Sequence, residues 1–186
     1  MSIYPEVPPV WYAGVFLFAF VLAIITIEAF DTKLPVWGLV LALAIGVFFL
    51  LPVGLIQAIT NQTVGLQVLA ELVAGYVLPG RPLANMIFKT FSFISLTQAI
   101  AFLGDLKLGH YMKVPPRTMF IAQIVATTVA VFVNIGVQEW MFSNIEDFCL
   151  PTQKDNFICP TTSVFATAAL IWGGIGPERM FGSGSM

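Results

Sequence analysis

Apolar stretches separated by short polar connections run along most of the chain. No ionised side chain occurs in the segments 7–27, 34–70 and 118–138. A helix needs about 20 apolar residues to cross a bilayer core of roughly 30 Å, and each of these segments is long enough. The pattern predicts an all-α, polytopic transmembrane protein, or part of one. Spans are expected at about 10–27, 34–59 and 118–140, with a kink in the second of them at Pro52 and Gly54.

The segment 65–103 differs because Pro79-Gly80-Arg81-Pro82 stands near its centre. Proline removes a backbone donor and clashes with the preceding turn, so a helix over 65–78 ends there and another resumes over 83–103. We expect a Pro-Gly broken or re-entrant helical hairpin. Irregular backbone at membrane depth is tolerated only inside protein or along a wet cavity, and in transporters it often marks the substrate path. A further, short apolar segment covers 164–175.

The composition supports a membrane protein and argues against other classes. Hydrophobic residues make up 58 % of the chain and charged residues 10 %, whereas soluble domains average about 25 % charged residues. The net charge of −2 and the absence of a basic run with interleaved aromatics give no sign of nucleic-acid binding. Because Met1 to Val10 carries Glu6 and no basic residue, a cleaved signal peptide is not expected.

Basic residues gather in one connection, at Lys107, Lys113 and Arg117. Cytoplasmic loops of membrane proteins carry an excess of Lys and Arg, so we place the loop 104–117 in the cytoplasm. The next span then puts the loop 143–160 outside the cell. Counting back, the N-terminus is cytoplasmic if the broken hairpin returns to its own side.

Cys149 and Cys159 both lie in the outer loop, and they are the only cysteines of the chain. A non-cytosolic loop with two cysteines favours a disulfide between them. Two unpaired thiols are the alternative.

Three ionisable residues lie in or beside the broken segment: Glu71, Arg81 and Lys89. A charge inside a span costs at least about 2.5 kcal/mol, so each needs a partner or water. Glu71 is either half of an ion pair, a protonated carboxyl, a proton-coupling group or a contact for a substrate ammonium. Lys89 shares a helical stripe with Asn85, and it either pairs with Glu71 across the break, snorkels or binds a substrate carboxylate. Arg81 either caps exposed carbonyl groups or binds an anionic substrate.

The remaining polar residues give no indication of an enzyme. Gln123, Thr127, Asn134 and Gln138 fall on one helix face, which favours interhelical hydrogen bonds over substrate contacts. His110 has no second histidine or paired cysteine at metal-ligand spacing, so neither a metal nor another cofactor is expected. The chain also has no nucleophile motif and no phosphate-binding glycine loop.

The connection before the 118–140 span carries the most specific string of the sequence. It reads Asp105-Leu106-Lys107-Leu108-Gly109-His110-Tyr111-Met112-Lys113-Val114-Pro115-Pro116-Arg117. Its end resembles the Lys-Ile-Pro-Pro-Arg motif of the oligopeptide transporter (OPT) family, with Val114 in place of isoleucine. Other strings resemble the same family: Gly65-Leu66-Gln67, Pro79-Gly80-Arg81-Pro82-Leu83-Ala84-Asn85, Cys159-Pro160 and Trp172-Gly173-Gly174-Ile175-Gly176-Pro177-Glu178-Arg179-Met180-Phe181-Gly182.

The resemblance covers nearly the whole chain and is closest to fungal small-peptide transporters. Family members are several times longer, so it implies a partial chain from the C-terminal half, with the rest of the transporter bundle as its partner. It implies that the intact protein is a proton-coupled symporter of small peptides in the plasma membrane, with glutathione among the candidate substrates. Glu71 with Lys89 or Arg81 would hold the charged ends of a peptide. Glu71 is the first candidate for proton coupling and His110 the second.

Two other interpretations stay open. The yellow-stripe-like branch of the same superfamily moves metal–chelate complexes, although the cysteine loop and the string from Gly176 to Gly182 favour the peptide branch. A chain of this length is also expected to be inactive alone, so a membrane fragment without transport activity is the remaining alternative.

Overall fold

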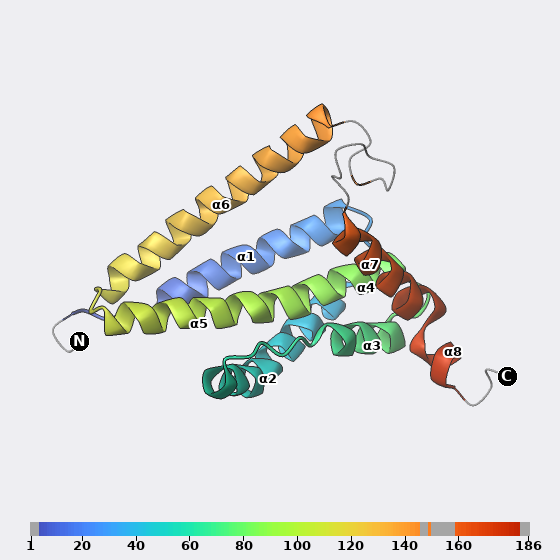
Figure 1. The fold of residues 1–186 in the computed structure, drawn as a ribbon, viewed down its shortest axis with the longest axis horizontal. Coiled ribbons are helices and arrows are strands. Elements are labelled where there is room, and N and C mark those ends of the chain that lie inside the picture. The colour runs from blue at the N-terminus through green and yellow to red at the C-terminus, as the bar shows by residue number, and fades with distance from the viewer. Residues whose placement is uncertain (1–3, 146–148, 150–158, 183–186) are drawn as a thin grey trace. The chain divides into compact units, whose positions relative to one another are not determined.

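The computed structural model describes residues 4–145, 149 and 159–182. Within these residues the regular structure is helical, and four helices are long and apolar enough to cross a membrane (Figure 1). They are Pro9–Ala29, Val36–Thr60, Pro82–Tyr111 and Pro116–Asn144. At this level the prediction of an all-α polytopic membrane chain is confirmed.

The helices follow one another in the order α1 (Pro9–Ala29), α2 (Val36–Thr60), α3 (Gln67–Val77), α4 (Pro82–Lys89), η1 (Thr90–Ile94), α5 (Ser95–Tyr111), α6 (Pro116–Asn144), α7 (Pro160–Ala169), η2 (Leu170–Ile175) and α8 (Pro177–Phe181), where η marks a π-helix. The chain divides into two compact units. The first unit is Met1–Tyr12 with Asp105–Val164, and the second unit is Ala13–Gly104 with Phe165–Met186.

Proline and left-handed residues set several helix boundaries. Pro82, Pro116 and Pro177 each occupy the first position of a helix, where the missing N–H is not needed and φ is already helical. Asn61 ends α2 in the left-handed conformation, with φ 56°, and its backbone N–H donates to the carbonyl of Gln57. These signals explain why α2 and α4 stop and start where they do.

The connection expected at 104–117 is shorter than predicted. α5 continues past Asp105 to Tyr111, and only 112–115 separate it from α6. This expectation is wrong because charge was taken to end the helix, whereas Asp105 stays helical and accepts a hydrogen bond from Gln123 Nε2 at 2.8 Å. The end comes at Lys113, which is left-handed with φ 57°.

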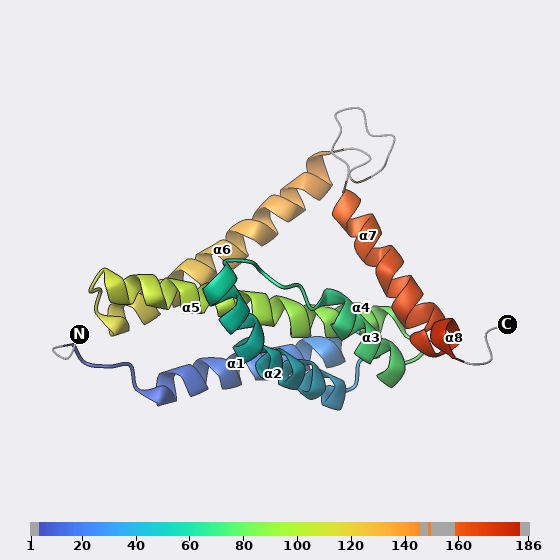
Figure 2. The ribbon, with the colours of Figure 1, turned by 60° about the horizontal axis from the view of Figure 1, so that its bottom comes forward.

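The break predicted in the segment 65–103 is present, although its two sides are unequal. Residues 78–81 are not helical, and they separate the short α3 from a continuous helical run, Pro82–Tyr111, that is long enough to cross a membrane by itself. A second irregular stretch, 61–66, joins α2 to α3. α3 and α4 pack side by side around the break (Figure 2).

The core of the second unit lies where α3 and α4 meet α2. Leu39, Ala42, Ala74, Ala84 and Phe88 belong to one buried apolar cluster. Three of these are alanines, and small side chains let neighbouring membrane helices approach closely. The core therefore fixes α4 against α3 and sets the positions of the polar residues that both helices carry.

Candidate functional site

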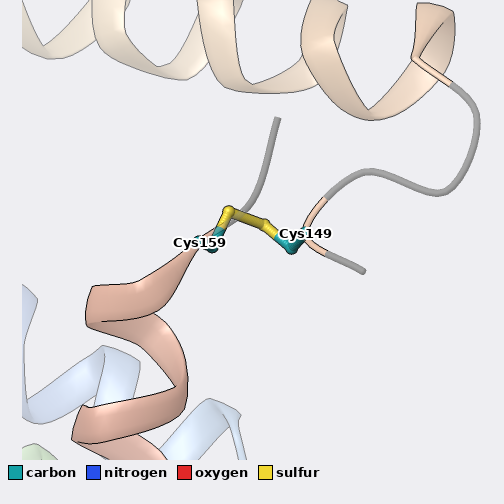
Figure 3. Close-up of a disulfide and its surroundings, with 2 residues drawn as sticks. All are labelled: Cys149 and Cys159. Atoms are coloured by element: carbon teal, nitrogen blue, oxygen red, sulfur yellow. A yellow bond between two sulfur atoms is a disulfide. The ribbon is translucent and has the colours of Figure 1, made fainter. Parts of the chain in front are cut away.

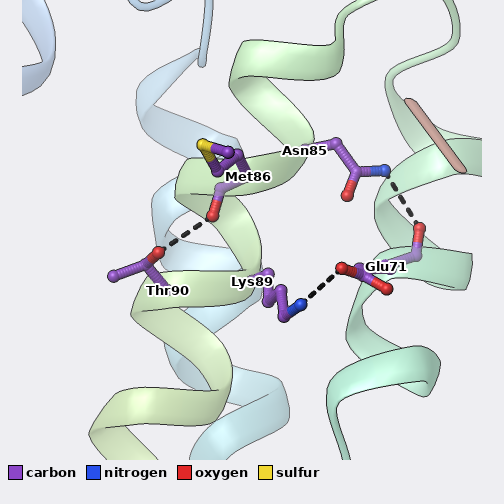
Figure 4. A network of polar contacts seen from close by, with 5 residues as sticks. All are labelled: Glu71, Asn85, Met86, Lys89 and Thr90. Atoms are coloured by element: carbon purple, nitrogen blue, oxygen red, sulfur yellow. Dashed lines mark hydrogen bonds and ion pairs between the residues drawn. The ribbon is translucent and has the colours of Figure 1, made fainter. Parts of the chain in front are cut away.

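The charged residues Glu71 and Lys89 meet inside the second unit. Lys89 Nζ, from the end of α4, donates to Glu71 Oε1, from the middle of α3, at 2.6 Å (Figure 4). Both residues are buried. An unpaired charge at such a site would be costly, and pairing removes most of that cost. The ion pair across the break, one of the alternatives that the sequence left open, is thus present.

Asn85 joins this pair from one turn earlier on α4. Its Nδ2 donates to the main-chain carbonyl of Glu71 at 3.1 Å, and its side chain is fully buried. Its Oδ1, however, has no hydrogen-bond partner in the structure, and in Figure 4 this oxygen lies on the side of the ion pair. Buried acceptors without a donor are rare, and each calls for an explanation such as an absent water or ligand.

Two glycines let the C-terminal helices close over this cluster. A Cβ on Gly173 of η2 would lie 2.8 Å from Pro82 Cα and 2.9 Å from Asn85 Cβ. A Cβ on Gly75 of α3 would lie 2.5 Å from the carbonyl oxygen of Trp172. Only glycine permits backbones to approach this closely. The sequence motif that begins at Trp172 is therefore explained by packing against α3 and α4.

An aromatic ring completes the site, and sequence reasoning missed it. Phe165 of α7 places its ring 4.1 Å from Lys89 Nζ, measured to the ring centroid. A cation over a ring face is attracted by the ring quadrupole, more strongly when water is excluded. No motif marks Phe165, and its contact with Lys89 spans a long sequence separation that local patterns do not report.

Arg81 makes its hydrogen bond to the main chain and not to the ion pair. It lies in the break, its side chain is exposed, and its Nη1 donates to the carbonyl of Lys33 at 3.1 Å. Lys33 is itself left-handed, with φ 57°, in the connection between α1 and α2. Of the two alternatives for Arg81, the structure contains the carbonyl cap, and it does not bring Arg81 to the Glu71–Lys89 pair.

The motif 105–117, which resembles the family signature, forms the turn between α5 and α6 in the first unit. The N–H of Val114 donates to Gly109 at 3.0 Å, and the N–H of Lys113 donates to His110 at 3.2 Å, which satisfies carbonyls at the end of α5. Pro115 and Pro116 then start α6.

Two basic side chains of this string, Arg117 and Lys107, have partners within the first unit. Arg117 Nε donates to the carbonyl of Glu6 at 3.3 Å, and Lys107 Nζ lies 5.8 Å from the ring centroid of Tyr111. Arg117 thus links the start of α6 to the N-terminal segment, and Lys107 makes its contact within α5. In the first unit they make structural contacts.

His110 also lies in the first unit, in the last turn of α5, whereas Glu71 belongs to the second unit. It lines a cavity of about 250 Å³ together with Tyr4, Glu6 and Met119. Among the residues that the structure describes, no group of three or more His, Cys, Asp or Glu side chains is arranged to hold a metal ion.

Cys149 and Cys159 are joined in a disulfide, with their Cα atoms 4.7 Å apart (Figure 3). Cys159 directly precedes α7, so the bond closes the connection between α6 and α7 near its end. The residues between the two cysteines lie outside the described part of the chain. An oxidising side of the membrane is required for such a bond to persist.

Comparisons with known proteins agree with the sequence motifs. Residues 1–185 match the family model described as OPT oligopeptide transporter protein. Oligopeptide transporter 1 of Arabidopsis thaliana is 50 % identical over 184 residues, which are 96 % of this chain and 24 % of that protein. Glutathione transporter 1 of Schizosaccharomyces pombe is 45 % identical over 184 residues, 99 % of this chain and 22 % of that protein.

A second fission-yeast relative is similar along the same stretch. Sexual differentiation process protein isp4 of Schizosaccharomyces pombe is 48 % identical over 181 residues, 97 % of this chain and 23 % of that protein. The chain therefore spans about a quarter of the length of the curated relatives it matches. No solved structure matches the chain.

Proposed function

Since this chain belongs to the OPT oligopeptide transporter family, we propose that it forms the peptide-carrying part of a proton-coupled transporter of small peptides. The family is one of transporters and not of enzymes. The observation that carries the proposal is the buried Glu71–Lys89 pair beside the unpartnered Oδ1 of Asn85. Buried ionisable residues between membrane helices are expensive, and they commonly mark substrate paths and proton relays.

The spacing of the pair decides how a peptide would use it. Glu71 Oε1 and Lys89 Nζ are 2.6 Å apart, whereas the charged ends of an extended tripeptide lie up to about 10 Å apart. The two partners therefore do not take the two ends of one peptide at once. In our proposal Lys89 turns to the carboxylate of the peptide, which leaves Glu71 without its cation.

Proton coupling follows from the same exchange. A buried carboxylate that loses its partner costs several kcal/mol, and a proton taken up by Glu71 removes that cost. One peptide and one proton would then occupy the site together and leave it together. Asn85 remains beside Glu71 through the main-chain hydrogen bond, and its free Oδ1 accepts a hydrogen bond from the protonated carboxyl or from the peptide.

The orientation of the chain in the membrane, and what covers its exposed apolar side chains, belong to the same proposal. We place 112–115 and the N-terminus in the cytoplasm, and the connection that carries the disulfide outside the cell, in the plasma membrane. Many large apolar side chains on α1 and α6 are exposed, and lipid and the rest of a larger bundle would cover them. On its own the 186-residue chain is expected not to transport.

The proposal is tested in a chimera in which this chain replaces the matching segment of Oligopeptide transporter 1. The chimera is expressed in yeast cells without other peptide uptake, and entry of a labelled tripeptide is measured with a ferric chelate as competitor. Uptake should rise as the external pH falls. N-acetylated peptide should enter and C-amidated peptide should not, because only the carboxylate is required.

Substitutions separate the roles. Glu71→Gln should abolish the dependence of uptake on external pH, whereas Glu28→Gln, at an exposed carboxylate of α1, should leave it unchanged. A chimera that reaches the cell surface and takes up no peptide would refute the proposed function. Uptake that is blocked by the ferric chelate and not by unlabelled peptide would assign a metal–chelate substrate instead.

A further inference from the structure

A cavity of about 360 Å³ lies in the second unit, between α2, the irregular stretch 61–66, the start of α3 and the helix η1–α5. Its volume falls within the usual range for small-molecule sites. Its polar lining residues are Gln57, Thr63, Gln67 and Thr97, and Phe93 adds an aromatic ring. No charged side chain contributes to the lining.

The irregular backbone of the stretch 61–66 borders this cavity, beside the middle of the helical run Pro82–Tyr111. Val64 and Gly65 line it from one side, and Leu96 and Thr97 line it from the other. Leu96 and Thr97 are the central residues of the helical run Pro82–Tyr111, which is long enough to cross a membrane. Non-helical backbone within a bilayer is tolerated only where it is buried in protein or lines a cavity that admits water.

One lining residue has an unmet hydrogen-bonding requirement. The Oε1 atom of Gln57 is buried and has no partner in the structure. The hydroxyl of Thr97 donates to the carbonyl of Phe93 at 3.0 Å, so its lone pairs remain available to a donor. The buried Gln57 Oε1 calls for an N–H donor, and the backbone of a peptide has one such donor per residue.

The cavity and the ion pair lie along the same two helices. On α3, Gln67 stands one turn before Glu71. On the run α4–η1–α5, Phe93 and Thr97 follow Lys89, and the eight residue steps from Lys89 to Thr97 rise at most about 12 Å at the α-helical 1.5 Å each. An extended tripeptide with its carboxylate at Lys89 has about that length.

We propose that this cavity binds the uncharged backbone of the peptide whose carboxylate is held by Lys89. Gln57 Oε1 accepts a hydrogen bond from a peptide N–H, and Gln67 supplies a second amide along the same path. The ring of Phe93 contacts a peptide side chain. The inference rests on the proposed function and assigns the substrate's neutral part to a second place in the same path.

The experiment compares a tripeptide with the depsipeptide in which an ester oxygen replaces the central N–H. Uptake of both is measured in the chimera and in its Gln57→Leu and Gln67→Leu variants. The unmodified chimera should prefer the tripeptide by about tenfold in uptake efficiency, since a buried acceptor left without a donor is costly. Gln57→Leu should reduce this preference to near unity and raise the KM of the tripeptide with little change in maximal rate.

Gln98→Leu serves as the matched control because Gln98 is exposed on α5 and does not line the cavity. It should retain the preference for the tripeptide. If the chimera transports peptide while Gln57→Leu and Gln67→Leu leave both KM and the preference unchanged, the inference is overturned and the proposed function stands. If the chimera transports no peptide, the proposed function and this inference fail together.

Discussion

Removing one member of the Glu71–Lys89 pair should destabilise the chain far more than removing both. The side chains of Lys89 and Glu71 are 6 % and 3 % exposed, and their charged atoms lie 2.6 Å apart. At an effective dielectric constant of about 20 this separation gives an attraction of roughly 6 kcal/mol. Desolvation of two ions costs several kcal/mol each, so the net contribution of the pair is small.

The single variants leave one charge buried without a partner. Glu71→Leu and Lys89→Met should therefore each lower the free energy of unfolding by roughly 3–5 kcal/mol. Lys89→Met also loses the cation–π contact with Phe165, although methionine keeps a favourable contact with the ring. The double variant should lie close to the unmodified chain, or be more stable by up to about 4 kcal/mol.

The measurement is equilibrium unfolding of the purified chain in mixed micelles with increasing SDS, followed by far-ultraviolet circular dichroism. Glu28→Leu, at an exposed carboxylate, serves as the control and should change stability by less than about 0.5 kcal/mol. A double-mutant cycle then gives the coupling energy of the pair. The buried pair would be refuted if each single variant lowered the free energy of unfolding by less than about 1 kcal/mol and the two losses added up in the double variant.

Three further outcomes test the packing and the disulfide. Gly75→Ala should destabilise the chain by about 1–3 kcal/mol in a thermal melt, since its Cβ would lie 2.5 Å from the carbonyl oxygen of Trp172. Gly54→Ala, which has no neighbour within 4 Å of its Cβ, should be neutral or stabilising in the same assay. Reduction of the Cys149–Cys159 bond should lower stability by roughly 2–3 kcal/mol, measured by unfolding with and without a reductant. After reduction in intact cells, a membrane-impermeant maleimide should label both thiols, and labelling only after permeabilisation would contradict the proposed sidedness.

The spans and the ion-pair candidates could be predicted because each depends on local sequence. The long apolar stretches fix α1, α2 and α6 whatever surrounds them, since about 20 apolar residues suffice to cross a bilayer. Burial of charge likewise demanded a partner for Glu71 and Lys89. Spacing alone did not select the pair, because its geometry depends on how α3 and α4 fold back around the break.

What the sequence did not reveal depends on contacts between distant segments. Phe165 reaches Lys89 from a helix much further along the chain, and Gly173 contacts Asn85 in the same way. For Arg81 the sequence left open a carbonyl cap and a substrate contact, and only the structure shows that the carbonyl of Lys33 is within its reach. Such pairings follow from tertiary packing, which hydrophobic period and charge placement do not encode.

The π-helical turn η1 interrupts the α-helical winding of the long helical run Pro82–Tyr111. It begins directly after Lys89, and one of its residues, Phe93, lines the cavity, so it connects the ion pair to the cavity along one helical run. Each residue of an α-helix turns the chain by about 100°, and π turns interrupt that regular winding, often at functional sites. Shifting the turn by one residue would rotate the side chains it passes by about a quarter of a circle while the helix on either side stays intact. The backbone of Ser92, within this turn, lies against Gly46 of α2, so such a rotation would take place in contact with α2.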